Sequence, residues 1–164
     1  MENNKIKSEL IDWIKSIVVA VIIAGIILYF ILPSRVQQHS MENTLKPGQF
    51  IFASMFLYDI KEPEVYDIAL MKIDYDGTGK KRLVKRIIAL EGQHVVIKDG
   101  TVTVDGQLLE ESYIKDEFTP GHIDLIVPSG HAFVLGDNRM VSVDSRGFGT
   151  VPLSKIYAKV LFND

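Results

Sequence analysis

A run of twenty residues from Trp13 to Leu32, WIKSIVVAVIIAGIILYFIL, constrains this chain more than any other feature. It is almost wholly apolar, apart from Lys15 and Ser16. A helix rises about 1.5 Å per residue, so roughly 20 apolar residues cross the ~30 Å hydrocarbon core of a bilayer. Trp13 and Tyr29 lie near the two ends of the run, where aromatic side chains favour the membrane interface. The run is therefore predicted to form a membrane-length helix.

Three interpretations of this run compete. A buried core helix is disfavoured, because nothing else in 164 residues could surround it. A cleaved signal peptide usually has a shorter apolar core and then small residues in an A-x-A pattern, which the following LPSRVQQHS lacks. We therefore expect a retained single-span anchor over residues 13–32, preceded by a cytoplasmic segment of residues 1–12.

The positive charges that flank the run predict its orientation. Lys5, Lys7 and Lys15 lie before the run or at its start, whereas Arg35 follows it. Because Lys and Arg gather on the cytoplasmic side of membrane helices, we expect the N-terminus in the cytoplasm. Residues 33–164 would then form a domain on the outer face of the membrane.

This outer domain is predicted to be all-β. Pro33 is expected to end the helix. Two Asp-Gly pairs, at Asp99 and Asp105, interrupt an alternating segment, and Asp-Gly between alternating strands is a strong hairpin signal. No amphipathic helix of any length is apparent, so we expect short antiparallel strands and hairpins. Strand-like stretches occupy residues 50–58, 68–73, 82–90, 94–110 and 122–138.

Composition excludes several classes of function. Without cysteine, the chain has no disulfide, zinc-thiolate site or thiol nucleophile. A net charge of -3 argues against binding to nucleic acid, for which a strongly basic domain is typical. The four histidines show no H-x-x-x-H pair, and the carboxylates form no cluster of metal-ligand spacing. We therefore expect no metal, no cofactor and no nucleic-acid partner.

The strand over residues 82–90 carries two basic residues in unusual positions. Successive side chains alternate in a strand, so Lys85 and Arg86 point to opposite faces. Whichever face is core, one basic side chain is pressed into apolar surroundings. The aliphatic stem of that side chain could extend to the protein surface and keep the charged group in water. Alternatively, burial could lower the pKa of Lys85 and make it a general base, a role that Arg86 cannot take because a guanidinium stays protonated.

Two polar stretches hold further candidates. QQHSMENTLKPGQ, residues 37–49, closely follows the apolar run and contains Ser40. A serine hydroxyl is a weak nucleophile until a neighbouring base removes its proton. GDNRMVSVDSRGFG, residues 136–149, holds charged residues, serines and glycines just after a predicted strand. It is either a polar surface loop with turn chemistry or a functional loop on a β scaffold.

A histidine base for Ser40 is the less favoured alternative to lysine. His39 is adjacent to Ser40, but neighbouring residues in an extended chain point to opposite sides. His94 and His131 fall in strand-like segments with no obvious Asp partner.

Three segments resemble those of one family and occur in the same order. SMENTL, VKRIIALEG and GDNRMVSVDSRGFG follow the predicted anchor, and the last matches G-D-N-R-x-x-S-x-D-S-R-x-x-G at every defined position. The chain resembles a bacterial type I signal peptidase of the Ser-Lys kind, in its compact single-span subfamily. The resemblance extends from Trp13 to the end of the chain. It implies a signal-peptidase-like β fold and a place in the bacterial plasma membrane.

The same resemblance implies a reaction. Ser40 is implied as the nucleophile and Lys85 as the general base. The reaction would hydrolyse one peptide bond of a secretory preprotein through an acyl-enzyme, after a site with small residues at the first and third positions. The signal peptide is expected to bind as an added β-strand, beside the lipid bilayer, and the enzyme is expected to be monomeric.

Supporting roles also follow from the resemblance. Ser142 is similar to a serine that hydrogen-bonds and orients the lysine. Asp144 and Arg146 correspond to a charged pair that braces the site, and we expect Arg86 to join them.

The sequence departs from the family pattern beside the predicted nucleophile. Gln38 stands where Gly or Ser is frequent, and Asn43 stands where Pro is usual. After the lysine, Ala89 and Glu91 replace the more usual Gly and Pro. The backbone N–H of Ser40 is still expected to donate to the oxyanion, with Gln38 as a candidate for the second donor.

Two other functions fit some of these features. A different Ser-Lys protease of related fold, such as a self-cleaving repressor, would carry a DNA-binding module where this chain has its apolar run. A membrane-tethered binding protein that has lost catalysis would not need the intact set of Ser40, Lys85, Ser142 and Asp144.

Overall fold

The N-terminal part of the chain is a single long helix. A computed structural model describes residues 2–162, and the chain divides into two compact units, Met1–Leu32 and Pro33–Asp164. Helix α1 spans Glu2–Phe30. Among the described residues, one helical segment is long and apolar enough to cross a membrane, and it is Glu9–Ile27 of α1. The helix ends at Phe30, three residues before Pro33, and Pro33 lies inside strand β1.

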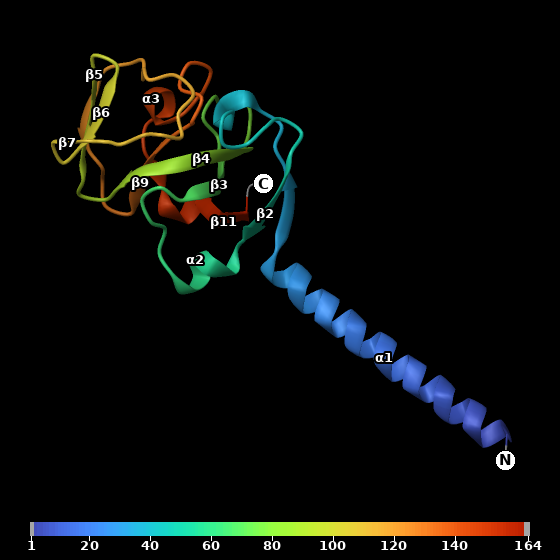
Figure 1. Cartoon of the computed structure of the whole chain (residues 1–164). Coiled ribbons are helices and arrows are strands. Elements are labelled where there is room, and N and C mark those ends of the chain that lie inside the picture. The colour runs from blue at the N-terminus through green and yellow to red at the C-terminus, as the bar shows by residue number, and fades with distance from the viewer. Residues whose placement is uncertain (1, 163–164) are drawn as a thin grey trace. The chain divides into compact units, whose positions relative to one another are not determined.

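The second unit is built from short strands in two sheets (Figure 1). The larger sheet has seven strands, and every pairing from β2 onward is antiparallel. In spatial order its strands are β1 (Leu32–Arg35), β2 (Phe50–Ser54), β11 (Ile156–Phe162), β3 (Ile68–Ile73), β4 (Lys81–Leu90), β9 (His131–Leu135) and β10 (Val151–Pro152).

The smaller sheet confirms the predicted hairpins. Its four strands run in the order β7 (Gln107–Leu108), β6 (Thr101–Val104), β5 (His94–Lys98) and β8 (Ile123–Ile126). The β5–β6 turn has φ 51° at Asp99 and 84° at Gly100, and the β6–β7 turn has φ 53° at Asp105 and 78° at Gly106. Two successive positive φ values define the tight hairpin turn that matches strand twist and favours Asp-Gly.

Strand β4 is buried on both of its faces from Lys85 to Ala89. One face contributes Ile88 to a core shared by β4, β5, β6 and β9. The other contributes Leu83 and Ile87 to a second core with β3, β9 and β11. In this segment neither face meets solvent, so Lys85 and Arg86 lie inside the protein, with exposed fractions of 1% and 8%.

The predicted strand over residues 50–58 is only half correct. Strand β2 stops at Ser54, and Phe56–Ile60 forms the short helix α2. The Ser54 hydroxyl accepts a hydrogen bond from the Leu57 N–H at 3.4 Å, which helps the chain turn there. The other short helices are η1 (His39–Met41), α3 (Ser145–Phe148) and η2 (Leu153–Lys155). The all-β prediction for this unit is confirmed.

Candidate active site

The structure brings Ser40 and Lys85 together. Ser40 lies in η1, Lys85 lies in β4, and a hydrogen bond of 2.5 Å joins Oγ of Ser40 to Nζ of Lys85. Burial lowers the pKa of Lys85 to about 8, although the carboxylates of Asp144 and Asp137 act in the opposite direction. The lysine is therefore not solvated at its tip, and its neutral form is accessible near physiological pH.

A close backbone approach holds the nucleophile in place. The N–H of Asn138 donates to the carbonyl oxygen of Ser40 at 3.0 Å. Gly136 lies beside this contact, and a Cβ at that position would overlap both the Ser40 carbonyl and the Ser142 hydroxyl. The glycine that begins the GDNR segment is thus needed because two loops touch there.

Ser142 lies in this crowded region without the expected partner. Its Oγ is buried and makes no hydrogen bond among the described residues. The predicted hydrogen bond between Ser142 and Lys85 is therefore not formed in this structure. Ser142 lies against Gly136, which belongs to the loop that contacts Ser40. The role of Ser142 in orienting the lysine therefore stays a prediction.

Asp144 and Arg146 form a buried ion pair, as expected. The Nε and Nη2 of Arg146 each donate to a different carboxylate oxygen of Asp144 at 2.8 Å. Asp144 caps helix α3 by accepting from the Arg146 N–H, and it also accepts from the Gly136 N–H at 3.1 Å. Bidentate Arg–carboxylate pairs fix geometry as well as charge, so this pair orders the loop that follows β9.

Arg86 does not join that pair, so this part of the prediction is wrong. Its Nε and Nη2 donate to the two carboxylate oxygens of Asp137 at 2.9 and 2.7 Å. The reason is that Arg86 and Lys85 point to opposite faces of β4. The Thr44 hydroxyl also donates to Asp137, and the Arg86 guanidinium lies 3.9 Å from the ring centroid of Tyr113. Arg86 thereby links β4 to the loop that carries Ser40.

A second buried arginine was not singled out from the sequence. Arg139 is 1% exposed and donates to the Glu111 carboxylate, with one bond of 2.9 Å, and to the Thr119 hydroxyl. Its Nε donates to the Gly136 carbonyl at 3.0 Å. Arg139 stands in the same motif as the predicted residues, but the sequence carries no signal that pairs it with the distant Glu111.

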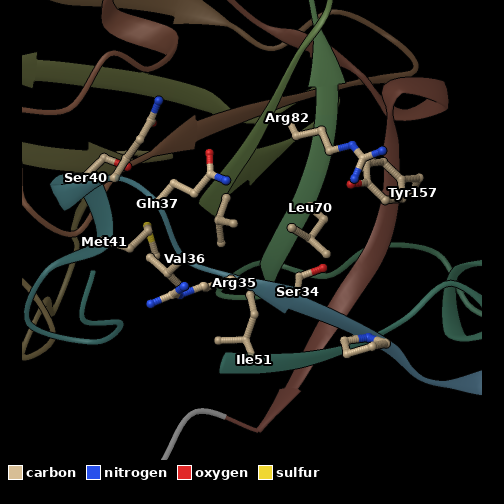
Figure 2. Close-up of a pocket in the computed structure, with 13 residues that line it drawn as sticks. Ser34, Arg35, Val36, Gln37, Ser40, Met41, Ile51, Leu70, Arg82 and Tyr157 are labelled. Carbon is tan, nitrogen blue, oxygen red and sulfur yellow. The ribbon is translucent and has the colours of Figure 1, made fainter. Parts of the chain in front are cut away.

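Two pockets border Ser40. The first has a volume of about 280 Å³, and Figure 2 shows Ser40 and Met41 at one end of it and Arg82 and Tyr157 at the other. The second, of about 360 Å³, borders Ser40 from the side of Val141 and Val143. Gln38 is exposed and lines both pockets. The first pocket is lined by Pro33, Ser34, Arg35, Val36, Gln37, Gln38, Ser40, Met41, Ile51, Leu70, Arg82, Val84 and Tyr157.

His39 and His94 each contact a carboxylate and not the Ser40 hydroxyl. The Nδ1 of His39 contacts the Glu42 carboxylate at 3.3 Å. His94 does have an aspartate partner, contrary to the expectation from sequence, since its Nε2 lies 2.7 Å from Asp124. That pair joins β5 to β8 in the smaller sheet. Among residues 2–162, no group of three or more His, Cys, Asp or Glu side chains is placed to hold a metal ion.

Comparison with known proteins agrees with this geometry. The chain is 32% identical over 163 residues to signal peptidase I of Bacillus licheniformis, covering 92% of this chain and 86% of the relative. It is 31% identical to signal peptidase IB of Staphylococcus aureus, covering 95% and 90% of the two chains. It is also 32% identical to thylakoidal processing peptidase 1 of Arabidopsis thaliana, but spans only 41% of that protein.

A solved structure and a family model point the same way. The crystal structure of a signal peptidase I from Enterococcus faecalis superposes with a TM-score of 0.52 at 33% identity, covering 63% of this chain and 99% of that one. The model of the family described as signal peptidase, peptidase S26, matches residues 10–163. With its buried Ser-Lys contact on an antiparallel β domain, the chain belongs to the signal peptidase family, peptidase S26.

Proposed function

We propose that this protein is a membrane-bound serine endopeptidase that removes N-terminal signal peptides from exported preproteins. The observation that carries the proposal is the 2.5 Å contact between the Ser40 hydroxyl and Lys85. A lysine in water has a pKa of about 10.4 and is almost wholly protonated at neutral pH. With its pKa lowered to about 8, Lys85 is neutral in about one molecule in ten at pH 7.

The proposed reaction begins with proton transfer. Neutral Lys85 accepts the proton of the Ser40 hydroxyl while Oγ attacks the carbonyl carbon of the scissile peptide bond. The resulting oxyanion would accept a hydrogen bond from the backbone N–H of Ser40, with the side chain of Gln38 as candidate for the second donor. The Lys85 ammonium then donates its proton to the leaving amine, and the C–N bond breaks to leave an ester on Ser40.

A second half-reaction regenerates the enzyme. Neutral Lys85 takes a proton from a water molecule as the water attacks the ester carbonyl. The second tetrahedral intermediate collapses, the Ser40 oxygen recovers the proton from Lys85, and the cleaved signal peptide leaves with a new carboxylate. Ser142, Asp144 and Arg146 support this cycle from the loop that contacts Ser40, and Arg86 supports it through Asp137.

The pockets around Ser40 support an extended peptide as substrate. Alternate side chains of an extended chain point to the same face, so the first and third residues before the cut would both face the pocket side of the site. We propose that both are small and that the signal peptide binds as an added strand. A monomer suffices for this arrangement, because the nucleophile, the base and the pocket all come from residues of one chain.

The apolar helix supports a membrane location. We propose that α1 spans the bacterial plasma membrane once, with its N-terminus in the cytoplasm and residues 33–164 on the outer face. This rests on the membrane-length segment Glu9–Ile27 and on the lysines that precede Trp13. The catalytic domain would then meet preproteins while their own apolar segment is still in the bilayer.

Cleavage by defined variants tests the proposed function. Purified full-length protein in detergent is incubated with a preprotein that carries a small-x-small site, and the new N-terminus is identified by mass spectrometry. Wild type is expected to cut after that site, and Ser40→Ala and Lys85→Ala are each expected to lose at least about 10³-fold in rate, as for other groups that act as a unit. Lys98→Ala changes an exposed lysine of β5 and serves as the matched control. Near-wild-type cleavage by Lys85→Ala would refute the dyad.

A further inference from the structure

Asn43 occupies a special position in the turn that follows the nucleophile. The N–H of Thr44 donates to the carbonyl of Met41 at 3.0 Å, Glu42 has φ -61° and ψ 134°, and Asn43 has φ 105°. These values describe a type II turn, whose third residue needs a positive φ and is Gly or Asn for that reason. Proline, with φ fixed near −65°, cannot occupy this position. The departure from the family pattern at Asn43 is therefore matched to the backbone of this turn.

The side chain of Asn43 connects this turn to a distant part of the chain. Its Nδ2 donates to the carbonyl of Tyr113 at 2.9 Å and to that of Ile114 at 3.1 Å. These acceptors belong to residues 110–120, which lie within the connection between β7 and β8 and which we name the strap. The amide thus ties the residues just after Ser40 to a segment some seventy positions away, where Lys115 also contacts the Glu42 carboxylate at 3.8 Å.

The strap is itself fixed to the groups around the base. Glu111 and Thr119 bind the buried Arg139, and the Lys115 N–H donates to the Asp137 carbonyl at 3.3 Å. The Tyr113 ring lies against the guanidinium of Arg86, the residue that follows Lys85. The strap therefore belongs to the same frame as β4 and the loop after β9.

We infer that Asn43 is a positioning residue that fixes Ser40 relative to Lys85. The inference rests on the proposed function, since it assumes that Ser40 attacks and Lys85 accepts the proton. Other contacts hold the same loop at three places. Asn138 binds the Ser40 carbonyl, Asn138 and Lys115 contact the Glu42 carboxylate, and Asp137 and Arg86 bind the Thr44 hydroxyl. The bonds from Asn43 act between these places and bind the turn to backbone carbonyls of the strap, so we expect their loss to let the turn shift relative to β4.

Matched glycine variants separate positioning from general loosening. Asn43→Gly keeps the positive φ but removes both hydrogen bonds of the amide. Asp105→Gly does the same at a hairpin of the smaller sheet, where Asp105 has φ 53° and accepts from the His94 N–H and from Gln93. Asn43→Pro removes the bonds and also forbids the turn.

We expect the Asn43 variants to lose activity mainly through a lower kcat. A misplacement of about 1 Å costs roughly 10²-fold in rate, so kcat of Asn43→Gly should fall about tenfold and that of Asn43→Pro about a hundredfold. KM for a soluble peptide should stay within about twofold for Asn43→Gly, because the pockets do not include Asn43. The midpoint of its pH–rate profile should also stay unchanged, since burial of Lys85 sets it. Asp105→Gly should leave kcat unaltered.

Each contrary result has a distinct meaning. A kcat for Asn43→Gly within twofold of wild type overturns the positioning role, and so does an equal loss in Asp105→Gly. A pH midpoint that moves toward the pKa of a solvated lysine also overturns it, because the site would then have opened rather than lost alignment. Undiminished activity of Ser40→Ala would remove the proposed function itself, whereas failure of the Asn43 variants alone would leave it standing.

Discussion

Lys85 gives the active site its expected pH dependence. Burial lowers its pKa to about 8, and only the neutral amine can accept the Ser40 proton. The rate should therefore fall about tenfold per pH unit below the midpoint and level off above it. The measurement is kcat/KM for a soluble peptide between pH 6 and 10, with circular dichroism to show that the fold persists. A profile that is flat over this range would contradict a lysine base.

The same burial should make Lys85 costly for stability. The folded-state pKa of about 8 lies below the ordinary 10.5, so between these values the unfolded chain binds more protons and the unfolding free energy rises with pH. A shift of this size corresponds to about 3 kcal/mol. The inactive variant Lys85→Met should be more stable than wild type at pH 7, and the difference should narrow toward pH 10.5. Urea unfolding at both pH values tests this, and an unchanged difference would contradict it.

Single residues were predictable where a motif specifies chemistry and less so where a partner is distant. Asp144 and Arg146 stand two positions apart in one motif, and the contact of Ser40 with Lys85, 45 positions apart, was predicted only because the family resemblance pairs those two motifs. The partner of Arg86 was not predicted, because Asp137 lies 51 positions away and is chosen by which face of β4 the arginine occupies. The contact of Asn43 with the strap left no sequence signal for the same reason.

Strand β4 and the loop after β9 are joined by the ion pair of Arg86 and Asp137. Removal of one partner leaves a buried charge without compensation, which costs about 3–5 kcal/mol. Asp137→Ala should therefore lower the unfolding free energy by that amount and also reduce cleavage, because Thr44 loses its acceptor. Chemical unfolding measures the first effect and peptide hydrolysis the second.

A double variant distinguishes stability from alignment at the same elements. In Arg86→Met with Asp137→Leu, both charges of this ion pair are removed and neither is left unpaired, so much of the lost stability should return. Cleavage should stay low, since neither the Thr44 hydroxyl nor the Tyr113 ring finds its partner. Recovery of activity together with stability would show that the ion pair does not align the nucleophile loop.

At the same scale, strands with a clear sequence pattern were predicted correctly, whereas the change from strand β2 to helix α2 was missed. Residues 68–73 form β3 with the predicted bounds, and the two Asp-Gly turns formed as expected. The error at residues 50–58 arose because an apolar run of that length fits a strand or a helix equally well. The hydroxyl of Ser54 accepts from the Leu57 N–H at the point where β2 gives way to α2.

At the scale of the whole molecule, the chain combines an apolar helix with a compact catalytic unit. The unit of residues 33–164 contains the nucleophile, the base and the first pocket. A truncated protein of residues 31–164, which retains all of β1, should therefore hydrolyse a soluble peptide with a kcat/KM within about threefold of the full chain, since no reacting group is lost.

The helix should matter only when the substrate is also tethered. Two partners held in one bilayer meet at a raised effective concentration, and linkage of this kind is worth about 10²–10⁴. Loss of residues 1–30 should therefore reduce cleavage of a preprotein embedded in vesicles about a hundredfold while leaving peptide hydrolysis intact. Ser40→Ala in the full chain controls for other proteases. Equal losses on both substrates would show instead that the helix stabilises the catalytic unit, and equal retention on both would show that tethering contributes nothing to recognition.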